Sequence, residues 1–134
     1  MLEGAELVAF VATTDLQRSH AFYGDRLRLR HVETTPFANV YDAGGTKLRV
    51  TLVEQRAGAP YTVLGWQVPD IVVAVRFLAE RGIAVKHFEG MGQNEAGIWT
   101  APGGARIAWF EDPDGNVLSV GQASPPPAPG EVEL

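Results

Sequence analysis

The stretch Val63-Leu64-Gly65-Trp66-Gln67-Val68-Pro69-Asp70-Ile71 repeats a pattern that the chain has already used in Val8-Ala9-Phe10-Val11-Ala12-Thr13-Thr14-Asp15-Leu16. Each copy begins with an extended apolar and aromatic run, which is typical of a strand, and each ends with an aspartate suited to the N-cap of a helix. Asp70 follows Asp15 by 55 residues. The repeat therefore predicts two similar modules, each opening with a strand and a helix.

The segments after the two aspartates carry a helical spacing of apolar residues. In the second segment these residues stand three or four apart: Ile71, Ala74, Val75 and Leu78. Gly82 would end that helix, and residues 16–27 form a rougher stripe of the same kind. Short extended segments separated by turn residues follow, at 29–35, 37–42 and 46–54 in the first module and 84–89, 98–100, 105–111 and 117–120 in the second. The order βαβββ in each module predicts an α+β fold.

The composition is that of one globular domain. The chain has 134 residues, 46% of them hydrophobic and 20% charged, which is enough for a core of its own. We expect this domain to span residues 1–122, with modules at about residues 5–57 and 61–122. Residues 123–134 are rich in proline and are expected to form a disordered tail.

Charge and cysteine content exclude several classes of protein. The net charge is -5 and no long basic cluster occurs, so nucleic acid is not expected as a partner. The chain has no cysteine, which rules out disulfides, thiolate metal sites and a cysteine nucleophile. No uncharged apolar run reaches the roughly 18–20 residues that a membrane helix needs, and the acidic N-terminus does not read as a signal peptide. We therefore expect a cytoplasmic protein without membrane contact.

Three motifs in the modules carry a resemblance to a known superfamily. They are Thr-Asp-Leu-Gln-Arg-Ser-His-Ala-Phe-Tyr-Gly (14–24), Pro69-Asp70-Ile71 with a helix ending at Arg81-Gly82, and Trp-Phe-Glu-Asp-Pro-Asp-Gly-Asn (109–116) before a final strand. Together they resemble the vicinal oxygen chelate superfamily, which includes glyoxalase I, extradiol dioxygenases, and fosfomycin-resistance and bleomycin-binding proteins. The resemblance covers about residues 5–122. It implies two βαβββ modules whose curved sheets surround an open cleft, with the helices outside.

The resemblance also implies where a metal ion would be held. Metal enzymes of the superfamily take one ligand from the first strand and one from the last strand of each module. In this chain the matching positions hold Val8, Thr51, Val63 and Ser119. Valine has no lone pair to donate, and neutral hydroxyls are poor ligands for a divalent cation. We therefore expect no metal and no other cofactor.

No other catalytic motif stands out. The histidines His20, His31 and His87 have no metal-site spacing, and nothing in the sequence predicts that they meet. No serine lies in a Gly-x-Ser-x-Gly motif, and the glycine pairs lack the context of a phosphate-binding loop. No catalytic residue is assigned.

Strand alternation indicates which side chains would line the cleft. The residues between the lining positions, such as Leu7 and Val11, would pack under the helices. Three aromatic residues, Phe37, Tyr61 and Trp99, would close over the cleft from loops. The candidate ligand-binding residues are Phe10, Arg49, Thr51, Gln67, Trp99 and Ser119. This mixture of apolar surface and a few polar atoms is typical of a small-molecule site.

Two function classes remain open. The missing metal ligands favour a metal-free binding protein of the bleomycin-resistance type, which would hold a drug or metabolite without chemistry. The alternative is a lyase, isomerase or dioxygenase-like enzyme with a non-standard or metal-free site. Its acid or base would come from among Glu54, Glu89, Glu95 and Glu111. An interaction subunit with an empty cleft is a third reading. A homodimer is expected, because edge strands beside apolar residues need to be covered.

Overall fold

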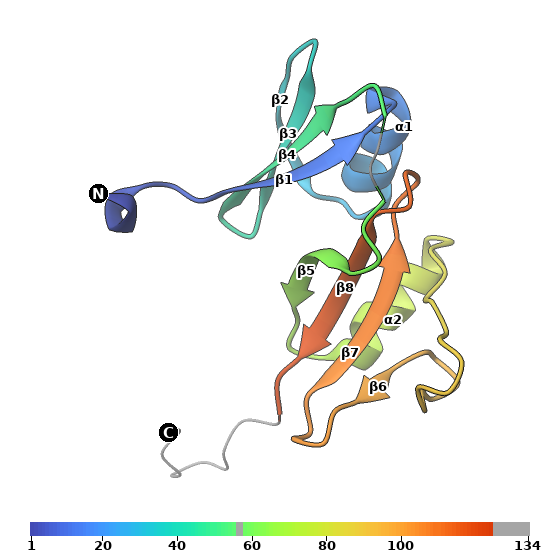
Figure 1. Cartoon of the computed structure of the whole chain (residues 1–134). Helices are drawn as coiled ribbons and strands as arrows, with labels where there is room; N and C mark the ends of the chain where they lie inside the picture. Colours follow the sequence, from blue (N-terminus) through green and yellow to red (C-terminus); the bar gives the residue numbers. More distant parts are fainter. Residues whose placement is uncertain (56–57, 125–134) are drawn as a thin grey trace. The chain divides into compact units, whose positions relative to one another are not determined.

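A computed structural model describes residues 1–55 and 58–124, and in these it contains two four-stranded sheets (Figure 1). The first sheet is formed by β1 (Val8–Thr13), β2 (Arg30–Thr34), β3 (Ala38–Ala43) and β4 (Thr46–Leu52). The second is formed by β5 (Thr62–Gln67), β6 (Trp99–Thr100), β7 (Arg106–Glu111) and β8 (Val117–Gln122). The strand orders are β1-β4-β3-β2 and β5-β8-β7-β6, so the second sheet repeats the first. The predicted α+β fold of two βαβββ modules is confirmed.

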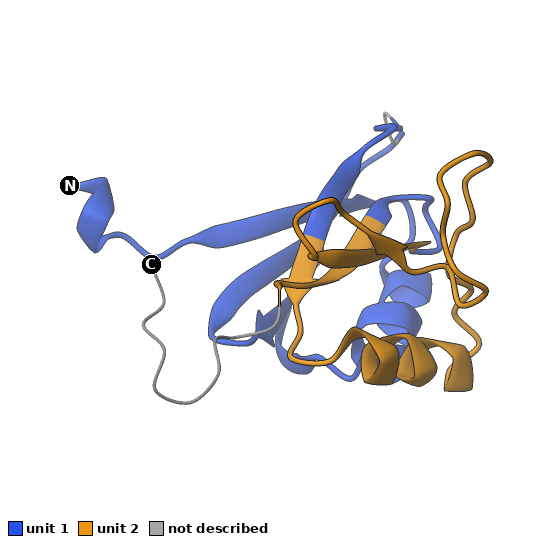
Figure 2. Cartoon of the chain, turned by 90° about the horizontal axis from the view of Figure 1, so that it is seen from below, with its two compact units in different colours: residues 1–64, 112–117 blue, residues 65–111, 118–134 orange. Residues whose placement is uncertain are grey.

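Contacts divide the chain into two compact units (Figure 2). The first comprises residues 1–64 and 112–117, and the second comprises residues 65–111 and those from 118 onward. The division passes through β5 and β8. The turn between β7 and β8 therefore belongs to the first unit by its contacts, although the second sheet contains both of these strands.

The two predicted N-caps are equivalent in the structure. Asp15 precedes α1 (Leu16–His20) and its side chain accepts a hydrogen bond from the Arg18 amide at 3.0 Å. Asp70 precedes α2 (Ile71–Glu80) and accepts one from the Val72 amide at 3.0 Å. The backbone of both aspartates is extended, with φ/ψ of -151/103 and -144/105 degrees. Each carboxylate satisfies an amide that the first helical turn leaves without a partner.

The first helix is longer than α1 alone. It continues into a π-helical turn, η2 (Ala21–Arg26), which ends where the Leu27 amide donates to the Phe22 carbonyl at 2.9 Å. The predicted stripe over residues 16–27 is thus helical throughout most of its length. A short 3-10 turn, η1 (Leu2–Gly4), precedes the first strand. The π turn contributes Phe22 and Tyr23, both buried, to the core of the first unit.

The burial pattern of the first sheet follows its register. β1 runs parallel to β4 with Val11 opposite Val50, and β3 runs antiparallel to β4 with Tyr41 opposite Leu48. These four side chains are buried on the face that meets the helix. Leu7 was expected on this face, but it is 74% exposed. The expectation is wrong because the β1 ladder starts one residue later, so Leu7 has no strand partner to place it in the core.

The predicted strand over residues 84–89 is also wrong. Only a single bridge forms there, between Val85 and Phe110. The loop that follows is held by the side chain of Gln93, which accepts from the Phe88 amide and donates to the carbonyls of Lys86 and Gly97. These side-chain bonds use backbone groups that a strand would have paired with a neighbour.

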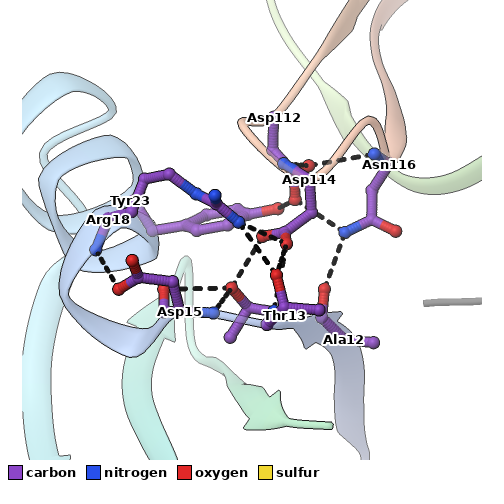
Figure 3. A network of polar contacts seen from close by, with 9 residues as sticks. Ala12, Thr13, Asp15, Arg18, Tyr23, Asp112, Asp114 and Asn116 are labelled. Carbon is purple, nitrogen blue, oxygen red and sulfur yellow. Dashed lines mark hydrogen bonds and ion pairs between the residues drawn. The ribbon is translucent and has the colours of Figure 1, made fainter. Parts of the chain in front are cut away.

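A buried carboxylate organises the turn between β7 and β8 (Figure 3). In the described part of the chain, Asp112 accepts hydrogen bonds from four donors: Tyr23 Oη at 2.6 Å, Asn116 Nδ2 at 2.7 Å, and the amides of Asp114 and Asn116 at 2.9 Å. Asn116 Nδ2 also donates to the Ala12 carbonyl at 2.9 Å. The turn is thereby fixed to helix η2 on one side and to strand β1 on the other.

A second carboxylate ties the same turn to the start of α1. Asp114 accepts from the Thr13 hydroxyl at 2.6 Å, from the amide and hydroxyl of Thr14 at 3.0 Å, and from Arg18 Nη2 at 2.7 Å. Burial would raise the pKa of Asp114, but these hydrogen bonds and the Arg18 charge outweigh it and lower the pKa. Because the pKa of Asp114 is lowered on folding, its carboxylate stabilises the fold at pH values above the unfolded pKa of about 3.9. That contribution to stability is lost as the pH falls through the pKa of Asp114 in the folded protein.

Among the residues that the structure describes, no helix has the length and apolar character needed to cross a bilayer. The predicted proline-rich tail, residues 123–134, lies outside the described residues apart from Ala123 and Ser124.

The bond from Tyr23 to Asp112 makes a testable contribution to stability. Tyr23→Phe leaves a buried carboxylate with one donor fewer, and hydrogen bonds to charged groups are the strong ones. We expect the free energy of unfolding to fall by about 1.5–3 kcal/mol, measured by denaturant unfolding at neutral pH. The control is Tyr61→Phe, at a side chain that is 67% exposed, where we expect a change within about 0.5 kcal/mol.

The pH dependence of the same variant separates this bond from general packing. Burial, and then the charge of Asp112, raises the pKa of the Tyr23 hydroxyl. The resulting stabilisation is fully present below the unfolded pKa of about 10 and is lost as the pH rises toward the folded value. The wild type should therefore lose stability above about pH 10 more steeply than Tyr23→Phe. Equal slopes in the two proteins would contradict the assignment.

Candidate functional site

The first sheet places three of the candidate residues on the face opposite its helix. Along β4, Leu48 and Val50 are buried toward the helix, whereas Arg49 and Thr51 alternate with them and point to the other side. Phe10 on β1 is the register partner of Arg49 and is 63% exposed. The structure thus brings Phe10, Arg49 and Thr51 together on one surface of the first unit.

The second unit holds a hollow of about 580 Å³, a volume within the range of small-molecule sites. Its lining includes the candidates Gln67 and Ser119, together with Gly65, Gly121 and Ile107. Ser119 Oγ lies 2.7 Å from the place where a Cβ on Gly65 would stand. The absence of a side chain at Gly65 therefore lets the Ser119 hydroxyl lie against β5.

An aromatic group adjoins this hollow. Trp99 is the register partner of Ile107, so both side chains lie on the same side of the second sheet. The Trp99 ring lies 6.1 Å from that of Trp109, and Phe88 meets Trp109 edge to face at 5.6 Å. The sequence reasoning named Trp99 but missed Trp109 and Phe88. Alternation along β7 from Ile107 to Trp109 was the signal that would have included Trp109.

Two of the loop aromatics that were expected to close over the cleft are exposed. Phe37 is 68% exposed and Tyr61 is 67% exposed. Their closure over a bound ligand stays a prediction. The side chain of Thr35 holds the Phe37 loop by accepting from the Phe37 and Ala38 amides at 3.1 and 3.0 Å.

The residues at the inherited metal positions do not fit a metal ion. Val8 and Thr51 lie on strands of the first sheet, and Val63 and Ser119 on strands of the second. Within residues 1–55 and 58–124, no group of three or more histidine, aspartate or glutamate side chains is arranged to hold a metal. A divalent ion needs about three or four imidazole or carboxylate donors. The chemistry of this donor set is therefore wrong for a catalytic metal.

Two histidines do meet, against the expectation from spacing. The ring centroids of His20 and His31 are 4.8 Å apart, and His20 Nδ1 lies 2.8 Å from Tyr41 Oη. The cause is the sheet register, because Tyr41 on β3 is the partner of His31 on β2 and faces the end of α1. Burial, and then the charge of Asp25, raises the pKa of Tyr41 to about 12, so its hydroxyl is protonated at neutral pH.

Comparison with known protein families identifies a superfamily. A family model described as the Glyoxalase/Bleomycin resistance protein/Dioxygenase superfamily matches residues 7–120. No curated protein matches the chain.

Solved structures share the fold at low sequence identity. A glyoxalase/bleomycin resistance protein/dioxygenase from Nocardioides is 17% identical, with a TM-score of 0.69 over 96% of this chain and 89% of its own. The lactoylglutathione lyase from Agrobacterium tumefaciens is 20% identical, with a TM-score of 0.68 over 89% of this chain and 93% of its own. A glyoxalase/bleomycin resistance protein/dioxygenase from Alicyclobacillus acidocaldarius is 19% identical, with a TM-score of 0.68 over 89% of this chain and 91% of its own. At these identities the likeness concerns the fold alone.

The donor set makes a prediction about metal binding. After chelator treatment, Zn²⁺, Ni²⁺ or Mn²⁺ at a small molar excess should leave the melting temperature unchanged, because tight binding to the native state would raise it. Elemental analysis of the protein after gel filtration checks the same point. The variant His31→Gln separates any weak binding at the histidine pair from binding elsewhere. Stoichiometric metal that persists in this variant would contradict the prediction.

Proposed function

Because the chain belongs to the glyoxalase/bleomycin resistance protein/dioxygenase superfamily, we propose that it is a metal-free small-molecule-binding protein of the bleomycin-resistance type. It holds a drug or metabolite and does not transform it. Membership of the superfamily confirms the resemblance of the sequence motifs. The fold alone does not choose among the superfamily's activities, since one fold supports many chemistries.

The observation that carries the proposal is the replacement of the metal donors. Two aliphatic and two hydroxyl side chains stand where the metal enzymes of the superfamily have ligands: Val8, Val63, Thr51 and Ser119. At the same time, the hollow around Gln67 and Ser119 keeps a volume suited to a small molecule. A chain that has lost the donors but keeps space at one of the former ligand positions is better suited to binding than to metal-assisted chemistry.

The residues proposed to contact a ligand lie on the helix-free face of each sheet. In the first unit they are Phe10, Arg49 and Thr51, and in the second they are Gln67, Trp99 and Ser119. Aromatic rings supply apolar contact area at a low cost in conformational entropy. The amide, hydroxyl and guanidinium groups supply the few hydrogen bonds that orient a bound molecule.

The glutamates named for the enzyme alternative give it little support. Glu54, Glu89, Glu95 and Glu111 are all exposed, and Glu111 is paired with Lys86. A carboxyl group that serves as a general acid or base is usually partly desolvated, which tunes its pKa toward the working pH. Exposed carboxylates lack that desolvation, so we prefer the binding function.

We also propose that the protein acts as a homodimer in the cytoplasm. Strand β2 lies at the edge of the first sheet and all five of its residues are exposed. Large apolar side chains are exposed nearby in sequence, with Val32 at 51% and Phe37 at 68%. An exposed strand edge with apolar neighbours is a surface that a second copy would cover.

A thermal-shift screen of metabolites and antibiotics tests the binding function. We expect at least one compound to raise the melting temperature, because it binds the native state alone. Gln67→Leu should weaken the binding of that compound about fivefold to tenfold, the effect of one lost hydrogen bond. The control is Val73→Ala on the exposed surface of α2, which should bind as the wild type does.

The same screen separates binding from catalysis. Each stabilising compound is incubated with the protein and recovered for mass spectrometry, and we expect it to be unchanged. Conversion into a product would overturn the binding-only function and favour the enzyme alternative. A screen in which no compound stabilises the protein would favour the interaction subunit.

A further inference from the structure

Arg49 is a part-buried cation without a partner in the part of the chain that the structure describes. It makes no hydrogen bond or ion pair within residues 1–55 and 58–124. The other part-buried arginines and lysines of that range are all engaged: Arg81 lies 3.9 Å over the Phe77 ring, Lys86 pairs with Glu111, and Arg106 donates to Gln122 at 3.1 Å. Placing a guanidinium in a partly desolvated position without an acceptor costs free energy. The structure therefore leaves Arg49 ready for an acceptor from outside the chain.

Thr51 provides a second unpartnered group on the same face. Its Oγ1 is buried and has no hydrogen-bond partner in the described chain, a condition it shares only with Ser19 Oγ. Thr51 lies two residues beyond Arg49 on β4, so the two side chains share a face about 6.6 Å apart along the strand. Buried polar groups are nearly always hydrogen-bonded. Two unpartnered donors side by side point to one missing acceptor.

The neighbours of these donors are apolar and small. Phe10 stands opposite Arg49 on β1, and Val40 stands opposite it on β3. Ala12 and Ala38 flank Thr51 on the same two strands. Small side chains on both sides leave the Thr51 hydroxyl without competing polar groups. The exposed Phe10 side chain, on the strand next to Arg49, offers contact area to an apolar group.

Two other charged residues of this face, Asp42 and Lys47, have partners of their own. Asp42 pairs with Arg30 at 3.0 Å, and Lys47 lies 4.0 Å from Glu6. Glu33 on β2 is the register partner of Val40, which is itself the register partner of Arg49, so β3 separates Glu33 from Arg49. The two residues form no ion pair among the described residues. Arg49 therefore offers a positive charge that no ion pair among the described residues neutralises, although the exposed Glu33 of this face also lacks an ion pair there and the whole chain carries -5.

We propose that the ligand carries a carboxylate, which Arg49 and Thr51 bind, and that its aromatic part lies against Phe10. This inference rests on the proposed binding function and names the class of compound for it. The guanidinium supplies charge-assisted hydrogen bonds, and the Thr51 hydroxyl donates a further one. In the metal enzymes of the superfamily, the position of Thr51 carries a metal-ligating group. In this chain it carries a hydroxyl, two residues along the strand from the Arg49 guanidinium. The preference of this position is thus reversed, from a cation to an anion.

Ligand-detected NMR and calorimetry with four probes test the proposal: benzoate, the neutral isostere benzamide, the cation benzylamine, and inorganic phosphate. Benzoate should bind the full chain at least about tenfold more tightly than benzamide or phosphate. Benzylamine should not bind. Benzamide binding as tightly as benzoate would overturn the role of the charge. Phosphate binding as tightly as benzoate would overturn the aromatic carboxylate class.

Substitutions locate the carboxylate. Arg49→Gln should weaken benzoate binding about tenfold or more, while Arg49→Lys, which keeps the charge, should lose less. The matched control is Lys47→Gln, on the same face of the same strand. Its affinity for benzoate should stay within about twofold of the wild-type value. Thr51→Val should weaken benzoate severalfold and raise the melting temperature of the free protein, because it removes an unsatisfied buried hydroxyl. Circular dichroism checks that each variant is folded.

The outcomes separate this inference from the proposed function. If Arg49→Gln binds benzoate as the wild type does, or if Lys47→Gln loses as much as Arg49→Gln, the carboxylate site is wrong. If a neutral or cationic compound from the metabolite and antibiotic screen binds the wild type and Arg49→Gln equally, while benzoate does not bind, the binding function stands and this inference fails. If neither benzoate nor any screened compound binds, both fail.

Discussion

The buried carboxylate of Asp112 is the constraint on which the rest of the first unit depends. Its four donors come from η2 and from the turn itself, and Asn116 carries the connection on to the Ala12 carbonyl of β1. Strand β8 begins at Val117, directly after this turn. One set of hydrogen bonds therefore fixes the end of β1 and the start of β8.

A rigid frame of this kind allows the chemistry of the strand faces to change without loss of the fold. In the first sheet, Arg49 and Thr51 alternate with the buried Leu48 and Val50 and lie on the opposite face, so they can change without disturbing that core. Val8 and Val63 in place of metal ligands cost the frame nothing, because β-branched residues suit strands. The fold can therefore persist while its sites turn from cation coordination to hydrogen bonding and aromatic contact.

Much of the fold was predictable because its signals are local. The aspartates Asp15 and Asp70 mark both helix starts through the donors of a single helical turn, and strand alternation placed Arg49 and Thr51 on one face. The sequence could not indicate that Asp114 bonds to Thr13, because about 100 residues separate them and nothing local records the contact. The meeting of His20 with His31 was missed for the same reason, since it follows from helix packing and sheet register rather than from spacing.

Native-state hydrogen exchange tests most directly whether the turn belongs to the cooperative core of the first unit. The amide of Thr14 donates to Asp114, and the amide of Asn116 donates to Asp112. The account predicts that both exchange only through global unfolding, with the same opening free energy as the amides paired between β3 and β4. Exchange of these two amides through a local opening, at a much lower free energy than the central strands, would contradict it.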